Sequence, residues 1–506
     1  MPSAMASAAA AYSQSAGRRA ELPRHAGRVL ALVCAAQFAL QLDFSIVNVA
    51  IPSVQRGLHF AASELQWLVT GYALTFGSLL LVGGRAADIV GRRRLLAAGL
   101  ALFGLASLGA GLAGSPAMLI AMRIVQGAAG AMISPAAFST LTTTYAQGDA
   151  RNRALAIWQA TTAAGATTGI VAGGILDTAF GWRAIFLVNP PLIAAMVALV
   201  PRWLPPGTRD ASQRMDIPGA VLATCSLAAL ILGVSHVERD GLGSAATLAP
   251  IAPSVALGVL FVVVERRVRQ PMLPLAIFAD PTRRAACVTM LLMGAITAAY
   301  VYFASLYLQK VEGFSPILTG VALVPATVTV VLTSTLLTRR LLRRFSVKRI
   351  LLAGLASVAA GQLWLAQISV GASYASAVLP ALILMAFGIA LIFPTVSVAV
   401  TAGVAPEQQG VAGALITTSQ QAGAAVGLAV LAMAAATGTA ATAHHSLTDG
   451  YRFSFLLGTG IALFASVIVS TVISSRACQE ELSLKRRLFG GARRLVSEAE
   501  IRLRGI

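Results

Sequence analysis

Charged residues are scarce in this sequence. Asp, Glu, Lys and Arg make up 11% of the 506 residues, whereas 57% are hydrophobic and the mean hydropathy is +0.78. Soluble domains carry about 25% charged residues. The composition therefore excludes a soluble globular protein and indicates a chain that crosses a membrane several times.

The side chains of most catalytic and metal sites are also few. Three of the four cysteines, Cys34, Cys225 and Cys287, fall in apolar stretches, and their spacing fits neither a disulfide framework nor a metal site. The five histidines lie outside the apolar stretches, and no set of nucleophile, base and orienting residue is evident. No nucleotide-binding P-loop is present. We therefore expect no enzyme activity, no metal, no cofactor and no use of ATP.

Long apolar stretches dominate the chain. Stretches of roughly 20 residues, the length that crosses the ~30 Å hydrocarbon core of a bilayer, recur from residue 29 to about residue 474. They predict an all-α polytopic membrane protein with fourteen transmembrane helices. The expected spans are 29–51, 65–84, 95–113, 116–139, 154–176, 184–200, 217–235, 245–264, 285–308, 317–338, 347–367, 377–400, 409–436 and 453–474.

The basic residues are placed unevenly. The net charge is +19, with 38 Lys and Arg. Those in the odd-numbered connections are Arg56, Arg183, Arg239, Lys310 and Arg452. All others except Arg123, which falls inside a span, lie in the tails and the even-numbered connections. The positive-inside rule places these regions and both termini in the cytoplasm. The basic runs are thus interpreted as topology signals and anionic-lipid contacts rather than a nucleic-acid surface.

Internal similarity divides the apolar region. The sequence LLAAGLA at 95–101 recurs as ILLAGLA at 350–356, an offset of 255, and Pro135 matches Pro394 at an offset of 259. Two glycines of the fifth span also match two of the thirteenth, at an offset of 258. The similar offsets predict a duplication with two six-helix bundles separated by an inserted helix pair, the arrangement of transporters that bind substrate between parallel halves.

This division predicts seven segments. The first apolar run is too long for a signal peptide, so the Ala/Ser-rich start is expected to be a flexible tail rather than a cleaved leader. The segments are an N-terminal cytoplasmic tail (1–28), a first six-helix bundle (29–200), a cytoplasmic linker (201–216), the inserted pair (217–264), a second linker (265–284), a second six-helix bundle (285–474) and a basic C-terminal tail (475–506).

Two charges lie well inside the predicted spans. Asp43 belongs to ALQLDFSIVNVAIP in the first span, and Arg123 lies in the fourth. At ~1.5 Å per residue both are roughly 10–12 Å from the outer boundary. If the two helices face each other, the guanidinium holds the carboxylate ionised until a proton or cationic substrate competes for it. A static ion pair that fixes helix packing is the alternative.

A second cluster lies at the cytoplasmic end of the second span, in GGRAADIVGRRRLL. Gly84 permits a close helix approach, Asp88 is a carboxylate at the boundary, and Arg92 and Arg93 follow a turn begun at Gly91. Taken alone, this pattern fits a positive-inside anchor, and only the family resemblance described below favours a cytoplasmic gate loop.

A third cluster is the glycine face of the fifth span, formed by Gly165, Gly169 and Gly173 with Gly174 beside it. Such spacing mostly indicates helix packing. Polar and aromatic residues elsewhere in the spans are candidates to line a substrate cavity. They are Phe44, Asn48, Trp67, Tyr72, Gln126, Trp158, Tyr300, Gln420 and Gln421.

With these residues the chain resembles the major facilitator superfamily, specifically its fourteen-helix drug:proton antiporters, over nearly all of the sequence between the tails. LDFSIVNVAIP resembles the first-helix signature, with Asp43 as its acidic residue. GRAADIVGRRRLL resembles the loop motif after the second helix, from which Ala86 and Ile89 depart. LIAMRIVQGAAGA resembles the fourth-helix motif through Arg123 and Gln126.

The resemblance implies transport by alternating access. Asp88 and the neighbouring arginines would latch the cytoplasmic side, proton entry would drive drug exit, and Arg123 would influence the protonation of a cavity acid. The glycine face of the fifth span resembles the antiporter motif of that helix, except that Ile170 stands in place of its proline. A proline kink that sets the direction of transport is therefore not carried over.

We therefore predict a proton-coupled exporter of amphipathic, cationic or aromatic small molecules in the bacterial inner membrane, driven by the proton gradient, with Asp43 as proton acceptor and Arg123 as its modulator. Its partners would be substrate, protons and membrane lipids. An importer or a lipid or metabolite transporter is the alternative. A non-transporting receptor or intramembrane enzyme is disfavoured because no large soluble domain and no catalytic set is evident. The sequence leaves the substrate open.

Overall fold

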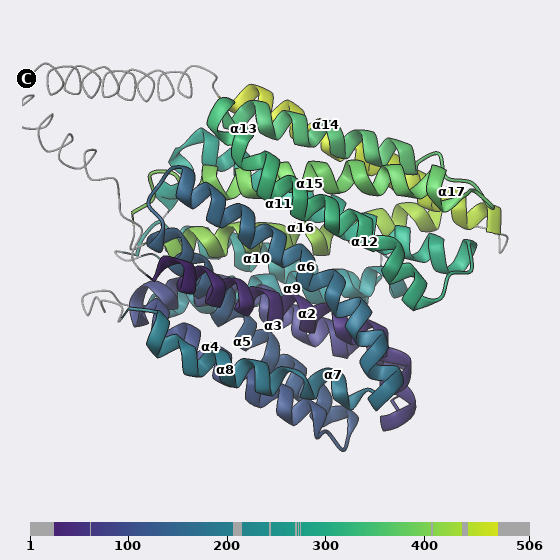
Figure 1. Cartoon of the computed structure of the whole chain (residues 1–506), viewed down its shortest axis with the longest axis horizontal. Helices are drawn as coiled ribbons and strands as arrows, with labels where there is room; N and C mark the ends of the chain where they lie inside the picture. The colour runs from purple at the N-terminus through teal and green to yellow at the C-terminus, as the bar shows by residue number, and fades with distance from the viewer. Residues whose placement is uncertain are drawn as a thin grey trace, which may run out of the picture. The chain divides into compact units, whose positions relative to one another are not determined.

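A computed structural model describes residues 25–60, 62–205, 215–241, 244–268, 271, 273, 275–405, 408–437 and 444–473. Most of the predicted tails and of the linker 201–216 lies outside these ranges. Every regular element among the described residues is helical, so the prediction of an all-α protein is confirmed (Figure 1).

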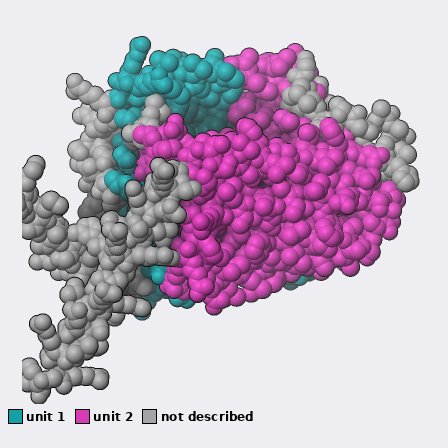
Figure 2. Space-filling model, turned by 90° about the horizontal axis from the view of Figure 1, so that it is seen from above, with its two compact units in different colours: residues 1–228, 254–273, 401–415 teal, residues 229–253, 274–400, 416–506 magenta. Residues whose placement is uncertain are grey.

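The chain forms two compact units, coloured separately in Figure 2. The first contains residues 1–228, 254–273 and 401–415, and the second contains residues 229–253, 274–400 and 416–506. The helices that lie wholly in the first unit are α2 (Ala26–Leu58), α3 (Ala62–Val90), α4 (Arg92–Gly111), α5 (Pro116–Thr144), α6 (Asp149–Phe180), α7 (Arg183–Leu187) and α8 (Asn189–Trp203).

Three helices contribute several residues to each unit: α9 (Ile217–Asp240), α10 (Ala245–Glu265) and α16 (Gln409–Thr437). The second unit holds the short 3-10 helix η1 (Leu275–Ala279) and the π-helical segments η2 (Tyr307–Val311), η3 (Thr333–Thr338) and η4 (Tyr374–Val378). Its α-helices are α11 (Pro281–Leu306), α12 (Pro316–Leu332), α13 (Arg339–Arg344), α14 (Val347–Leu365), α15 (Leu379–Thr401) and α17 (His444–Val472).

Twelve helices of the described chain are long and apolar enough to cross a membrane. Helices α14 and α16 lie over two further predicted spans but are not among the twelve. Large apolar side chains also face outward: Phe180 is 76% exposed in the first unit and Phe464 is 59% exposed in the second. An apolar outer surface of this kind is suited to lipid, because hydrocarbon solvates it. The chain is an integral, multi-pass membrane protein.

Local sequence signals start several helices. Ser115 accepts a hydrogen bond from the Met118 amide (3.3 Å), and Pro116 occupies the first turn of α5. Asp280 accepts one from the Thr282 amide (2.7 Å) before Pro281 in α11. These caps accept hydrogen bonds from backbone N–H groups that have no partner inside the helix. Proline suits the same position because it has no N–H group to leave without a partner.

In the first unit, α3 packs along α5, α2 along α6, and α4 along both α5 and α8 (Figure 1). In the second unit, α17 packs against α14 and α11. The contacts of matching glycines are alike in the two units. A Cβ placed on Gly99 of α4 would lie 2.9 Å from Ile133 Cγ1 of α5, and one on Gly354 of α14 would lie 2.6 Å from Ile392 Cγ1 of α15. Both pairs match at the offsets found in the sequence.

Candidate functional site

The Asp43 carboxylate and the Arg123 guanidinium form a buried ion pair between α2 and α5. Arg123 Nη1 donates to Asp43 Oδ2 at 2.6 Å. The Asp43 side chain has no exposed surface, and that of Arg123 is 1% exposed. The two residues predicted to share a depth are therefore in direct contact.

Two amides complete the environment of the carboxylate. Gln126 Nε2 donates to Asp43 Oδ1 at 3.1 Å, and Asn189 Nδ2 of α8 donates to the same oxygen at 2.8 Å. Gln126 also accepts from Arg123 (2.9 Å) and donates to Ser107 Oγ of α4 (2.7 Å). Asp43 thus receives hydrogen bonds from three side chains on two helices, which stabilises a buried negative charge.

The guanidinium is held by α3 as well. Arg123 Nε donates to the Leu68 carbonyl at 3.0 Å, and its Cζ atom lies 4.4 Å from the centroid of the Tyr72 ring. Tyr72 packs in turn on Phe44, with ring centroids 5.7 Å apart. Because a cation over a ring face is attracted to it, Arg123 keeps several favourable contacts that do not depend on Asp43.

Sequence reasoning missed Asn189 and Ser107. Asn189 is fully buried and lies in the apolar segment FLVNPPL, where a lone amide inside a predicted span was the available signal. Ser107 is a small hydroxyl in α4 and gives no such signal.

Replacing Asn189 is expected to destabilise the protein. Asn189→Ala leaves Asp43 Oδ1 with one donor fewer in a dry environment, which should cost about 1–3 kcal/mol. The melting temperature of the purified protein in detergent measures this loss of stability. Asn48→Ala is the matched control, because Asn48 is an exposed amide of α2 that bonds only to the Phe44 carbonyl. Equal melting temperatures for the two variants would contradict the role assigned to Asn189.

The gate-loop residues meet the first turn of α16. Asp88 accepts hydrogen bonds from the amides of Gly410 (3.1 Å) and Val411 (3.2 Å), and Arg92 Nη2 lies 3.8 Å from Asp88 Oδ1. Gly84 makes the approach possible, since a Cβ there would lie 2.8 Å from the Gly410 carbonyl oxygen. A carboxylate at a helix N-terminus is favoured by the free amides and the helix dipole.

The rest of the loop supports this contact. Gly91 has φ of 99°, a conformation that side chains other than glycine rarely adopt, and it starts α4. Arg92 Nη1 donates to Thr143 Oγ1 at 3.1 Å. Arg93 is half-buried.

The glycine face of α6 packs on α2. A Cβ placed on Gly165 would lie 2.8 Å from the Phe38 carbonyl oxygen, one on Gly169 2.6 Å from that of Leu42, and one on Gly173 3.0 Å from that of Ile46. Gly174 is buried. The glycines therefore let two helices approach closely, as their spacing mostly indicates.

Gly169→Ala is accordingly expected to lower stability by about 1–3 kcal/mol, because the added methyl group meets the backbone of α2. Thermal unfolding of the purified protein measures the loss. Gly27→Ala serves as control, since a Cβ at Gly27 has nothing within 4 Å. The prediction fails if both substitutions have the same effect on the melting temperature.

The proposed cavity residues are divided between the two units. Tyr72 and Gln126 belong to the Asp43 network, and Phe44 joins it through Tyr72. Trp67 is half-buried, Asn48 is exposed, and Trp158 packs edge-on against Phe138. Tyr300, Gln420 and Gln421 lie in the second unit. A shared substrate cavity for all of them stays a prediction.

The fold and this site define an all-helical, multi-pass membrane protein with a buried, hydrogen-bonded charge network in its first unit. The family model described as Major Facilitator Superfamily matches residues 33–428. The chain therefore belongs to the major facilitator superfamily.

Curated relatives cover most of the chain. The cephamycin export protein of Amycolatopsis lactamdurans is 37% identical over 455 residues, which are 88% of this chain and 92% of the relative. The puromycin resistance protein of Streptomyces alboniger is 34% identical over 460 residues, with 88% and 91% covered. The lincomycin resistance protein of Streptomyces lincolnensis is 32% identical over 439 residues, with 85% and 89% covered.

Solved structures agree in fold. The human organic anion transporter TETRAN superposes with a TM-score of 0.63 at 16% identity, covering 88% of this chain and all of that one. A proton:xylose symporter gives a TM-score of 0.62 at 13% identity, with 89% and 96% covered. At these identities the comparison establishes the fold alone.

Proposed function

We propose that this protein exports antibiotic-like and drug-like small molecules from the bacterial cytoplasm by proton-coupled alternating access. The observation that carries the proposal is the similarity along most of the chain to proteins named for cephamycin export and for puromycin and lincomycin resistance. The transported compounds would be amphipathic, with a cationic or aromatic group.

Proton coupling is assigned to the Asp43 network. Asp43 is an acid inside a predicted span whose carboxylate accepts hydrogen bonds from Arg123, Gln126 and Asn189. A proton on the carboxylate removes the charge that Arg123 pairs with, so Arg123 must then rely on Gln126, the Leu68 carbonyl and the Tyr72 ring. Protonation therefore changes the bonding between α2, α5 and α8, which is how a proton can bias two conformations.

The cytoplasmic gate is assigned to Asp88 and the start of α16. The two hydrogen bonds from backbone amides to Asp88, together with the nearby Arg92, hold this contact closed. Opening toward the cytoplasm requires these bonds to break, so their loss would favour the state that is open inward.

The proposed topology has fourteen crossings, with the helix pair α9 and α10 inserted between two six-helix bundles and both termini in the cytoplasm. It rests on the excess of Lys and Arg in the even-numbered connections and on helices over each of the expected spans. The proton gradient supplies the energy, and neither ATP nor a cofactor takes part.

Efflux in inverted membrane vesicles tests the proposal. A pH gradient, acidic inside, should drive uptake of a cationic dye and of puromycin into vesicles that contain the protein, and a protonophore should abolish it. Vesicles from cells without the protein are the control. Uptake that depends on ATP rather than on the gradient, or uptake of neither compound, would contradict the proposal.

A further inference from the structure

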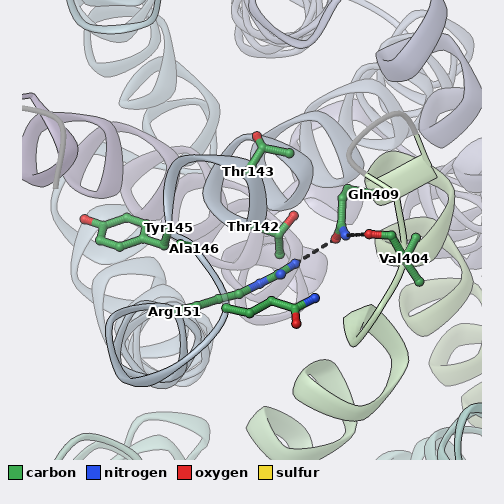
Figure 3. Close-up of a pocket in the computed structure, with 8 residues that line it drawn as sticks. Thr142, Thr143, Tyr145, Ala146, Arg151, Val404 and Gln409 are labelled. Atoms are coloured by element: carbon green, nitrogen blue, oxygen red, sulfur yellow. Dashed lines mark hydrogen bonds between the residues drawn. The ribbon is translucent and has the colours of Figure 1, made fainter. Parts of the chain in front are cut away.

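A cavity opens in the first unit beside the gate contact, between the loop that joins α5 to α6 and the start of α16 (Figure 3). Its volume is about 300 Å³, at the lower end of the range for ligand pockets. The polar side chains of its lining are those of Thr142, Thr143, Tyr145, Gln147, Arg151 and Gln409.

One lining residue carries a charge, and that charge is buried. Arg151 is 5% exposed, and no carboxylate belongs to the described lining. Arg151 Nη2 donates to Gln409 Oε1 at 2.8 Å, while its Nε has no hydrogen-bond partner. A guanidinium has five N–H donors and keeps its charge in proteins. A buried cation with one neutral acceptor is a costly arrangement unless an anion accompanies it.

The hydroxyl groups of the lining already donate to backbone carbonyls, so the guanidinium is the main donor available to a ligand. Thr142 and Thr143 both donate to the Ser139 carbonyl, and Tyr145 donates to the Ala26 carbonyl (2.8 Å). The amide of Gln409 donates to the Val404 carbonyl at 2.8 Å, which directs its oxygen toward Arg151 (Figure 3).

We propose that this cavity binds an oxyanion of the phosphate type, held by Arg151 with the Gln147 side chain at its mouth. A phosphate offers several acceptor oxygens to the free N–H groups of a guanidinium and compensates its charge, which neither a neutral nor a cationic ligand does. The ligand is a free phosphate compound or the phosphate of an anionic lipid headgroup.

The site has a mechanical consequence. Arg151 lies in the first turn of α6, and Gln409 begins α16, one residue before Gly410, which donates to Asp88. An anion on Arg151 would hold the α5–α6 loop and the start of α16 together next to the gate contact. The site is separate from the Asp43 network, so its test is independent of the direction and the substrate of transport.

The test is thermal unfolding of the purified full-length protein in a neutral detergent, with inorganic phosphate replacing chloride at constant ionic strength. If the ligand is a free phosphate compound, the melting temperature of wild type should rise in a saturable manner. Arg151→Gln should weaken the apparent affinity for phosphate by at least about tenfold. Arg153→Gln, which removes an exposed charge from the same helix, should leave the affinity unchanged.

A second variant avoids any change in the buried residues. Gln147 is exposed, and Gln147→Glu places a negative charge at the mouth of the cavity. It should weaken phosphate binding several-fold without lowering the melting temperature in chloride. If phosphate stabilises wild type, an equal response of Gln147→Glu would overturn the site.

Lipid nanodiscs distinguish the two sources of phosphate. If the ligand is a headgroup, phosphatidylglycerol should stabilise wild type relative to phosphatidylcholine alone, Arg151→Gln should lose this gain, and inorganic phosphate should have no effect in detergent. If the ligand is a free phosphate compound, inorganic phosphate should stabilise wild type in detergent, and phosphatidylglycerol should give no gain over phosphatidylcholine. The proposal is overturned if neither probe has an effect that depends on Arg151.

Discussion

Asp43→Asn is expected to abolish pH-gradient-driven export while dye movement down its own concentration gradient persists. The substitution keeps the shape of the side chain and an oxygen for Arg123, but it removes the charge that takes up a proton. Arg123 retains its bonds to Gln126 and to the Leu68 carbonyl, so we expect the fold to survive. Gradient-driven uptake should fall at least about tenfold. A tenfold fall corresponds to the loss of roughly 1.4 kcal/mol of coupling free energy.

The measurement compares both modes of transport in inverted vesicles at equal membrane expression. Asp177→Asn is the matched control, because Asp177 is an acid of the same unit whose Oδ2 accepts only a neutral hydrogen bond, from Ser53 (2.7 Å). If Asp43→Asn transports as well as wild type, the network is structural and the coupling acid lies elsewhere, first at Asp177 or Glu64. If both modes are lost together, Asp43 serves folding rather than coupling.

Asp88→Asn is expected to open the cytoplasmic side and to reduce export. The neutral amide keeps the size of the carboxylate but loses two charge-assisted bonds to the start of α16 and the attraction of Arg92. Bonds to a charged group contribute about 1.5–3 kcal/mol. The population of the closed gate should therefore fall roughly tenfold to a hundredfold.

The rate at which a cysteine is labelled reports this shift. Gln408→Cys, in a background without the four native cysteines, should react faster with a membrane-impermeant maleimide in inverted vesicles when Asp88→Asn is present. Arg94→Gln is the control, because Arg94 is an exposed arginine in the first turn of α4. Unchanged labelling in Asp88→Asn, or equally fast labelling in Arg94→Gln, would contradict the gate assignment.

Several features of the fold follow from local rules and were predictable. Apolar length locates the spans because the hydrocarbon core has a fixed thickness, and the helices of the structure lie over the predicted ranges. Helix rise per residue is constant as well, so counting from the span ends gave Asp43 and Arg123 the same depth. The depth of the pair was predictable, whereas the direction in which each side chain points was not.

Other features depend on which helices become neighbours. The glycines of α6 left packing and transport roles open, and the contacts with α2 assign them to close packing. Asn189 completes the Asp43 site only because α8 lies beside α2. The cavity at Arg151 needs the start of α16, which is 258 residues away in the chain.

The sequence by itself determined that this is a helical membrane protein, that helices lie over its apolar stretches, and that Asp43 and Arg123 can meet if their helices face each other. Hydrophobic length, charge asymmetry and helix rise are local properties, so one chain is enough to show them. Only the tertiary structure decided that Asp88 binds the first turn of α16 and that Asn189 reaches Asp43. Every residue except proline carries a backbone N–H group, so these groups give no sequence signal, and their role appears only where folding leaves them free beside a carboxylate.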